Sequence, residues 1–279
     1  AAVALSVAVM LFGREINGSK RWLALGPFSF QPSEFAKVAL ILFLADLVTK
    51  NVKTIGKMWT LCRIMFWILP IVGLVGASNL STAIIILGFG VILIFVASPK
   101  YAQFALMGIA GACFMGIFLA LESYRLERLA IWRNPEKYEK GYQTLQGLYA
   151  IGSGGVFGVG IGNSVQKLGF VPEAQNDMIF SIICEELGLA GAGIIVFLFL
   201  LLIWRFFLIA SGSRDLFGAL IATGAMAHMM IQVILNIAVV TNTIPNTGIT
   251  LPFISYGGTS VMFLLIEMGL VLSVSQVVD

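Results

Sequence analysis

Four acidic residues crowd the start of one strongly apolar segment of the chain. Glu173, Asp177, Glu185 and Glu186 come before the apolar run Leu189–Phe207. A carboxylate near hydrocarbon is costly, so ionisable groups at membrane depth are functional candidates by default. If Asp177 is already helical, Glu185 lies about 12 Å deeper on roughly the same side of the helix. These side chains are therefore the first candidates for binding or proton transfer.

The composition places the chain in a lipid bilayer. Of the 279 residues, 59% are hydrophobic and only 11% are charged, and the mean hydropathy is +0.97. An ordinary soluble domain needs far more polar surface. The first residue is not Met, and the apolar run 1–12 has no basic segment before it. We interpret this run as part of a truncated helix rather than as a signal peptide, and we expect sequence upstream of it.

Several classes of site are disfavoured by the residue types present. The net charge of +3 is spread along the chain, which gives no indication of nucleic-acid binding. Three cysteines without paired spacing and the single histidine, His228, argue against a zinc site. The glycines of the run Gly152–Gly162 never take the spacing of a dinucleotide-binding loop. We expect this run to be a tight backbone passage that lets a sugar or a helix approach closely.

Hydropathy predicts an all-α polytopic membrane protein. Helices are favoured because the bilayer core requires backbone hydrogen bonds to be made within the segment. About eight membrane segments are expected, the first of them partial: 1–12, 33–49, 64–80, 82–98, 101–121, 178–204, 216–240 and 254–275. The segments 64–80 and 82–98 are so close that they should form a tight hairpin.

The basic residues of the short loops predict the orientation. Seven basic residues fall in or beside the loops 49–63, 99–100 and 205–215, against three in the opposite short loops. The positive-inside rule therefore places those three loops in the cytoplasm. Residues 13–31, 122–177 and 241–253 are then outside.

The outer segment 122–177 is too long to be a simple connector. Its tyrosines, taken singly, are typical of an interfacial aromatic belt. We expect the loop as a whole to fold back on the membrane face, with short helices near 125–134 and 141–151. Because loops on a rigid scaffold often carry the chemistry, it is the predicted functional segment.

Motifs in one order along nearly the whole chain resemble the SEDS proteins (shape, elongation, division and sporulation), the group of RodA, FtsW and SpoVE. The resemblance is closest to FtsW and SpoVE of Gram-positive bacteria. The motifs that carry it are 17–23, 31–37, 79–83, 132–135, 141–146, 150–155, 160–167, 172–177, 185–188, 245–248, 251–252 and 255–258. The resemblance implies a ten-helix fold in which this chain begins within the third helix. It also implies a single transmembrane domain over 1–279, with the 122–177 loop outside the cell.

The resemblance implies a peptidoglycan glycosyltransferase that joins lipid II units by β-1,4 bonds at the outer face of the bacterial cytoplasmic membrane, for cell division or cell shape. A sugar hydroxyl needs a positioned base, and Asp177 is the candidate. Basic side chains or a divalent cation (Mg or Mn) should stabilise the leaving pyrophosphate, with Lys37, Arg21 and Lys167 as candidates. No organic cofactor is expected, and the implied protein partner is a class B penicillin-binding protein, a transpeptidase. The expected substrate-binding residues are Arg21, Trp22, Gln31, Glu34, Lys37, Gln143, Gln146, Lys167, Glu173, Glu186, Ser255, Tyr256, Gly257 and Gly258.

Several of these residues also have plain structural interpretations. Asp177 is a favoured residue type for capping a helix, and Glu186 suits a helix start. Lys37 can pair with Glu34 one turn earlier or extend to the membrane interface. We expect His228 to be a packing residue that is hydrogen-bonded to a neighbouring helix.

Two other functions are compatible with the same residues. A lipid II flippase would use a membrane cavity with the charges of Glu34 and Lys37, and it would not need Asp177 for bond chemistry. A non-catalytic scaffold would only recruit the transpeptidase. Polymerisation by the purified protein distinguishes the three.

Overall fold

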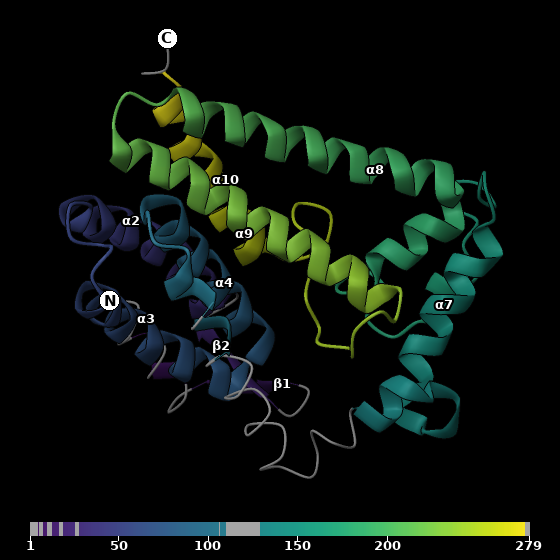
Figure 1. Cartoon of the computed structure of the whole chain (residues 1–279). Coiled ribbons are helices and arrows are strands. Elements are labelled where there is room, and N and C mark those ends of the chain that lie inside the picture. The colour runs from purple at the N-terminus through teal and green to yellow at the C-terminus, as the bar shows by residue number, and fades with distance from the viewer. Residues whose placement is uncertain are drawn as a thin grey trace. The chain divides into compact units, whose positions relative to one another are not determined.

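The computed structural model describes residue 5 and residues 8–9, 13–16, 19–25, 28–105, 107–109 and 129–276. This part of the chain is mainly helical (Figure 1). Within it, five helices are long and apolar enough to cross a bilayer: Met58–Ala77, Leu80–Ala97, Ile179–Gly212, Leu216–Val240 and Gly258–Ser275. The predicted class, a helical polytopic membrane protein, is confirmed.

The long helices of the described residues are α2 (Pro32–Asn51), α3 (Met58–Ser78), α4 (Leu80–Ala97), α8 (Ile179–Gly212), α9 (Leu216–Val240) and α10 (Gly258–Ser275). Each helix overlaps a predicted span, although α3 begins six residues before its predicted start and α8 ends eight residues after its predicted end. The predicted tight hairpin is present, since Asn79 alone separates α3 from α4 and its side chain caps α4 by accepting a hydrogen bond from Thr82 N at 3.2 Å. The predicted spans 1–12 and 101–121 lie largely outside the described residues.

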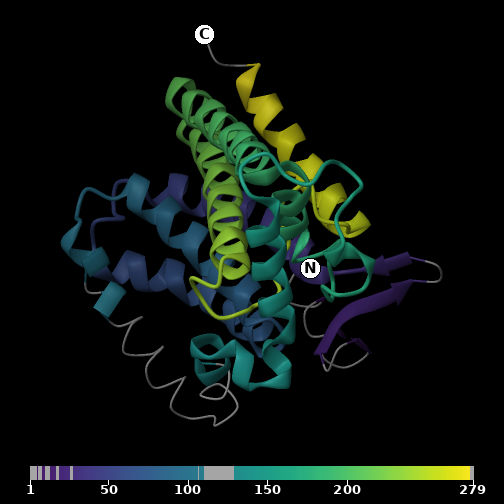
Figure 2. The same cartoon turned by 90° about the vertical axis from the view of Figure 1, so that its right-hand side faces the viewer.

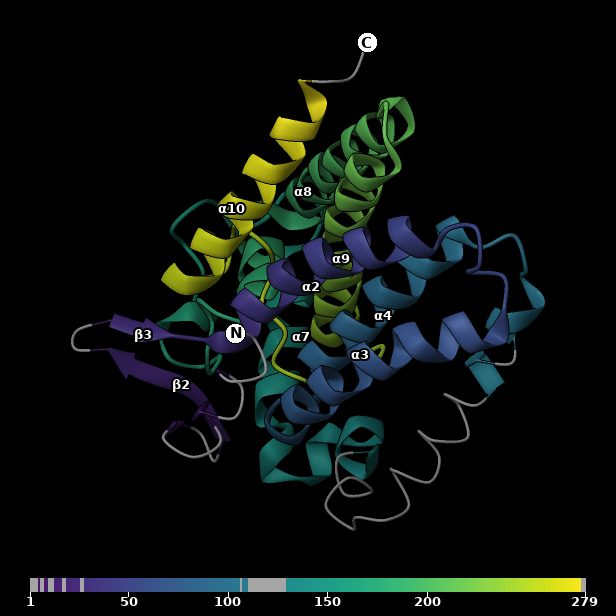
Figure 3. The same ribbon diagram turned by 90° about the vertical axis from the view of Figure 1, so that its left-hand side faces the viewer.

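The chain divides into two compact units, which are described separately. Unit 1 comprises residues 1–101, 202–231 and 257–279, and unit 2 comprises residues 102–201 and 232–256. In unit 1, α2, α3 and α4 pack against one another (Figure 3). Their shared core includes Leu44, Ile68 and Phe89, which are fully buried.

Unit 1 also contains a small antiparallel sheet ahead of α2 (Figure 2). Its strands are β1 (Arg14–Ile16), β2 (Ser19–Leu25) and β3 (Phe28–Phe30), in the order β1-β2-β3. Residues 13–31 were predicted only to be an outer loop. The sequence does carry a hairpin signal there, because Asn-Gly at 17–18 favours a two-residue turn.

Unit 2 holds most of the long predicted loop. After the short 3-10 helices η1 (Pro135–Lys137) and η2 (Glu139–Gly141) comes α7 (Tyr142–Gly154), followed later by η3 (Gln166–Leu168). α7 confirms the helix predicted near 141–151. Of the helix predicted near 125–134, residues 129–133 are helical and residues 125–128 are not described.

A candidate active site around Asp177

Asp177 lies at the end of the turn that precedes α8. Because α8 begins at Ile179, Asp177 is not yet helical, and the predicted depth of Glu185 relative to it does not apply. The backbone groups of Asp177 and Met178, immediately before α8, are hydrogen-bonded to the carboxyl group of Asp177. Its side chain is buried, with only 8% of the residue exposed. The capping and the catalytic interpretations of Asp177 therefore both stay predictions.

Burial changes the acidity of this carboxyl group. Removal from water raises the pKa of Asp177 from 3.8 to about 6, and the negative charge of Glu173 adds to the rise. A hydrogen bond from Gln143 and backbone hydrogen bonds act in the opposite direction. A carboxyl group with a pKa near 6 is largely ionised at neutral pH and is still basic enough to take up a proton.

Hydrogen bonds from two other segments hold the main chain at Asp177. The buried amide of Asn236, on α9, donates to Asp177 O at 2.9 Å and to Ile249 O at 2.6 Å. Ser255 Oγ donates to Asn176 O at 2.6 Å. Tyr256 N donates to Gln175 O at 2.9 Å, while the Tyr256 ring is exposed. The segment before α10 is thus tied to the turn that carries Asp177.

One side-chain amide donates to the carboxyl group, and a second amide donates to the first. Gln143, on the first turn of α7, donates through Nε2 to Asp177 Oδ1 at 3.5 Å and to Pro172 O at 3.3 Å. Asn246 Nδ2 donates to Gln143 Oε1 at 3.0 Å. The predicted binding residue Gln146 is half-buried on the same helix, one turn after Gln143.

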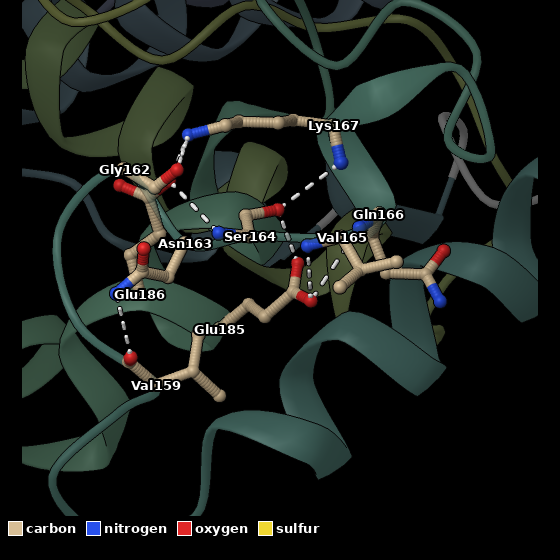
Figure 4. A network of polar contacts seen from close by, with 9 residues as sticks. All are labelled: Val159, Gly162, Asn163, Ser164, Val165, Gln166, Lys167, Glu185 and Glu186. Carbon is tan, nitrogen blue, oxygen red and sulfur yellow. Dashed lines mark hydrogen bonds and ion pairs between the residues drawn. The ribbon is translucent and has the colours of Figure 1, made fainter.

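A second polar cluster surrounds Glu185 (Figure 4). The buried carboxylate of Glu185 accepts hydrogen bonds from Ser164 Oγ, from Val165 N at 3.1 Å and from Gln166 N at 3.4 Å. A buried charge is tolerated when its oxygens are satisfied in this way. Glu185 therefore holds the 164–166 segment onto α8.

Glu186 and Lys167 form an ion pair in the same cluster. Lys167 Nζ lies 2.6 Å from Glu186 Oε1 and also donates to Gly162 O at 2.7 Å (Figure 4). Ser164 N donates to the same carboxylate at 3.4 Å. Both residues were predicted to bind substrate, and the structure shows them binding each other. A Lys ammonium has three donors, and two of those of Lys167 are used here.

The glycine run lies directly against α8. Gly160 N donates to Glu186 O at 3.0 Å, and Leu189 N and Ala190 N donate to the carbonyl groups of Gly155 and Val156. A Cβ atom added to Gly158 would overlap the main chain of Glu186, and one added to Gly188 would overlap that of Val156. The predicted tight passage is confirmed, with a helix as the partner.

The other predicted binding residues lie in unit 1. Glu34 and Lys37 form a buried ion pair of 2.9 Å on α2, and Ser260 Oγ donates to Glu34 at 3.1 Å. This is the pairing considered from the sequence. The remaining members of the unit 1 set lie on β2 (Arg21 and Trp22), just before α2 (Gln31) and at the start of α10 (Gly257 and Gly258).

His228 is a buried packing residue, as predicted. Its Nδ1 lies 2.8 Å from Glu267 Oε2, so α9 and α10 are joined through a polar contact. The described residues contain no group of three or more His, Cys, Asp or Glu side chains that would suit a metal ion. Because Mg²⁺ is commonly held by one or two carboxylates together with substrate phosphates, the divalent cation stays a prediction.

Two residues that hold Asp177 were not predicted from the sequence. Asn246 falls within the 245–248 motif, but no role was given to it. Asn236 is one of two amides, with Gln232, within the apolar helix α9, where a polar side chain needs a partner. This need for a partner was a signal in the sequence that Asn236 bonds another segment.

Comparison with known proteins gives the family. The model of the FtsW, RodA and SpoVE family, described as "Cell cycle protein", matches residues 1–279. Stage V sporulation protein E of Bacillus subtilis is 42% identical over 271 residues, covering 93% of this chain and 72% of that protein. Probable peptidoglycan glycosyltransferase FtsW of Coxiella burnetii is 38% identical over 281 residues, covering 96% of this chain and 74% of that protein.

Solved structures agree with the sequence comparison. A chain from a peptidoglycan synthase complex matches with a TM-score of 0.82 and 29% identity, covering 99% of this chain and 78% of that chain. The rod shape determining protein RodA of Thermus thermophilus matches with a TM-score of 0.70 and 29% identity, covering 99% and 75%. The chain therefore belongs to the FtsW, RodA and SpoVE family of cell-cycle membrane proteins.

Proposed function

We infer that this chain is a peptidoglycan glycosyltransferase and that Asp177 is its general base. The observation that carries the assignment of Asp177 is its environment. A buried carboxyl group with a pKa of about 6 is held by hydrogen bonds to its main chain and side chain. Relatives that cover most of the chain bear the name of this activity.

The proposed reaction uses lipid II, a lipid-linked disaccharide, at the outer face of the bacterial cytoplasmic membrane. Asp177 accepts the proton from the sugar 4-hydroxyl of the acceptor. That oxygen forms the new bond to C1 of the donor sugar, and the bond from C1 to the pyrophosphate oxygen breaks. Undecaprenyl pyrophosphate leaves with the electron pair. Positioned proton transfer of this kind contributes roughly 10²- to 10⁴-fold to rate.

Two further parts of the reaction stay predictions. The group that stabilises the pyrophosphate stays a prediction, because Lys167 and Lys37 are engaged in ion pairs. A divalent cation entering with the substrate also stays a prediction, and chelation during the polymerisation assay tests it. The partner is proposed to be a class B penicillin-binding protein, since one structural neighbour comes from a peptidoglycan synthase complex.

The test is polymerisation of labelled lipid II by the full-length protein with its partner, whose transpeptidase is blocked by penicillin. Asp177→Asn keeps the size of the side chain and removes the base, so glycan synthesis should fall by at least about 100-fold. Glu136→Gln is a matched control, because Glu136 is an exposed acidic residue on η1 of the same loop. Near-normal synthesis by Asp177→Asn would refute the assignment. Lipid II transport without any glycan would favour the flippase instead.

A further inference from the structure

The amide side chains beside Asp177 have a defined direction. At one end, the backbone N–H of Gly248 donates a hydrogen bond to Asn246 Oδ1 at 3.2 Å. Asn246 must then present its Nδ2 to Gln143 Oε1, at 3.0 Å. Gln143 must in turn present Nε2 to Asp177 Oδ1 and to Pro172 O. The orientation of amides usually has to be assigned, and here the two backbone groups at the ends leave one consistent choice.

The same segment is fixed to Asp177 by a second route. The amide of Asn236 joins Ile249 O to Asp177 O, so the residue after Gly248 is tied to the main chain of the aspartate. Gln232, one turn earlier on α9, donates to Thr250 O at 3.0 Å. Asn236 and Ile249 are fully or almost fully buried. Residues 246–250 are therefore fixed in position relative to the carboxyl group of Asp177.

We propose that Gly248, Asn246 and Gln143 form a directional hydrogen-bond relay that presents an N–H to the carboxylate of Asp177, and that Asn246 is a positioning residue. This proposal rests on the proposed function of Asp177. The relay favours the ionised form of the base, because a donor at a carboxylate stabilises its negative charge. It also aims Oδ1 toward α7 and leaves the second oxygen, Oδ2, beside Gly248, which has no side chain.

Few charged groups near Asp177 influence its ionisation in addition to the relay. α7 and residues 232–256 carry no Asp, Glu, Lys, Arg or His, and their titratable side chains are Tyr142, Tyr149 and Tyr256. On the chain of Asp177 itself, Glu173 opposes ionisation through its charge. Glu185 and Glu186 follow on α8 and are satisfied by the 164–167 segment. The uncharged relay is therefore the side-chain feature that offsets Glu173.

The test is the pH dependence of lipid II polymerisation by the full-length protein with its penicillin-blocked partner. In Asn246→Ala, Gln143 loses the donor that orients it, so the acid-side midpoint should move upward by about half a pH unit. The rate near pH 6 should fall by a few fold, and the rate should recover at high pH. A role in folding alone would lower the rate equally at every pH.

A double substitution separates the relay from independent effects. Gln143→Ala should shift the midpoint in the same direction, and adding Asn246→Ala to it should shift the midpoint no further. Additive shifts would overturn the relay, as would an Asn246→Ala profile with the wild-type midpoint. If wild-type protein makes no glycan at all, the proposed function itself fails.

A reversed-polarity variant covers the case in which Asn246→Ala does not fold. Asn246→Asp offers only acceptors when ionised, so Gln143 must turn its oxygen toward Asp177, and a larger upward shift is expected. Asn242→Asp is the matched control, because Asn242 lies in the same connection between α9 and α10. Its amide donates to Trp132 O and not to Gln143. Equal shifts in the two variants would show that added charge, and not the relay, is responsible.

Discussion

The carboxyl group of Asp177 is buried, and water would stabilise its charged form better than the protein interior does. Its pKa of about 6 means that ionisation at neutral pH is opposed by burial and by Glu173. A base must be ionised to accept a proton, so the polymerisation rate should rise with pH through about 6. Initial rates measured from pH 5 to 9 test this, with Asp177→Asn expected to lose this titration. A wild-type rate that does not change between pH 5 and 7 would contradict it.

The same pKa predicts a change in stability. The folded-state pKa of Asp177 is raised above 3.8, so its contribution to stability is full below that pH and is lost as pH rises through about 6. Asp177→Asn should therefore stabilise the protein at pH 7.5, by about 3 kcal/mol at most, and have little effect near pH 4. Thermal unfolding in detergent at several pH values tests this prediction. An equal effect at all pH values would contradict the pKa assignment.

Asp177 and Gln143 could be picked from the sequence, and Asn236 carried a usable signal, whereas Asn246 did not. An acidic residue beside a membrane helix is rare enough to be noticed. Asn246 has no such signal, because asparagine is common in loops and its contact with Gln143 joins residues 103 positions apart. Lys167 and Glu186 were both predicted to bind substrate. Nothing in the sequence indicates that these opposite charges, 19 residues apart, pair with each other.

At the scale of elements, the glycine run Gly152–Gly162 packs against α8 through direct contact between the two main chains. Gly188 has φ 67° and ψ −172°, a conformation essentially confined to glycine. Gly188→Ala should combine this strain with overlap of Val156, lowering stability by at least about 2 kcal/mol. Gly193→Ala is the control within α8, because a Cβ atom there meets nothing within 4 Å. Equal melting temperatures for the two variants would contradict the contact.

The sequence predicted the helices of the chain better than the segments between them. α9 was predicted with its observed bounds, because apolar length in a bilayer leaves few alternatives. α8 extends eight residues beyond its predicted end, since hydropathy falls before the helix does. The β1 to β3 sheet was not predicted, because hydropathy detects long apolar helices and not strands of three to seven residues.

At the scale of the whole molecule, the orientation in the membrane stays a prediction from loop charge. It requires residues 52 and 212 to be cytoplasmic and residue 140 to be outside. In a background without native cysteines, Lys140→Cys should react with an impermeant thiol reagent in intact cells. Val52→Cys and Gly212→Cys should react only after the membrane is opened. Labelling of residue 52 without residue 140 would reverse the orientation and remove Asp177 from the outer face.

The contact between the glycine run and α8 also has a genetic consequence. Where side chains pack, a larger residue on one side can be accommodated by a smaller one on the other. At Gly158 and Gly188 the atoms that meet belong to main chains, which no substitution can shorten. A selection for second-site suppressors of Gly188→Ala should therefore return true revertants, and compensating changes at residues 154–160 should be missing from it.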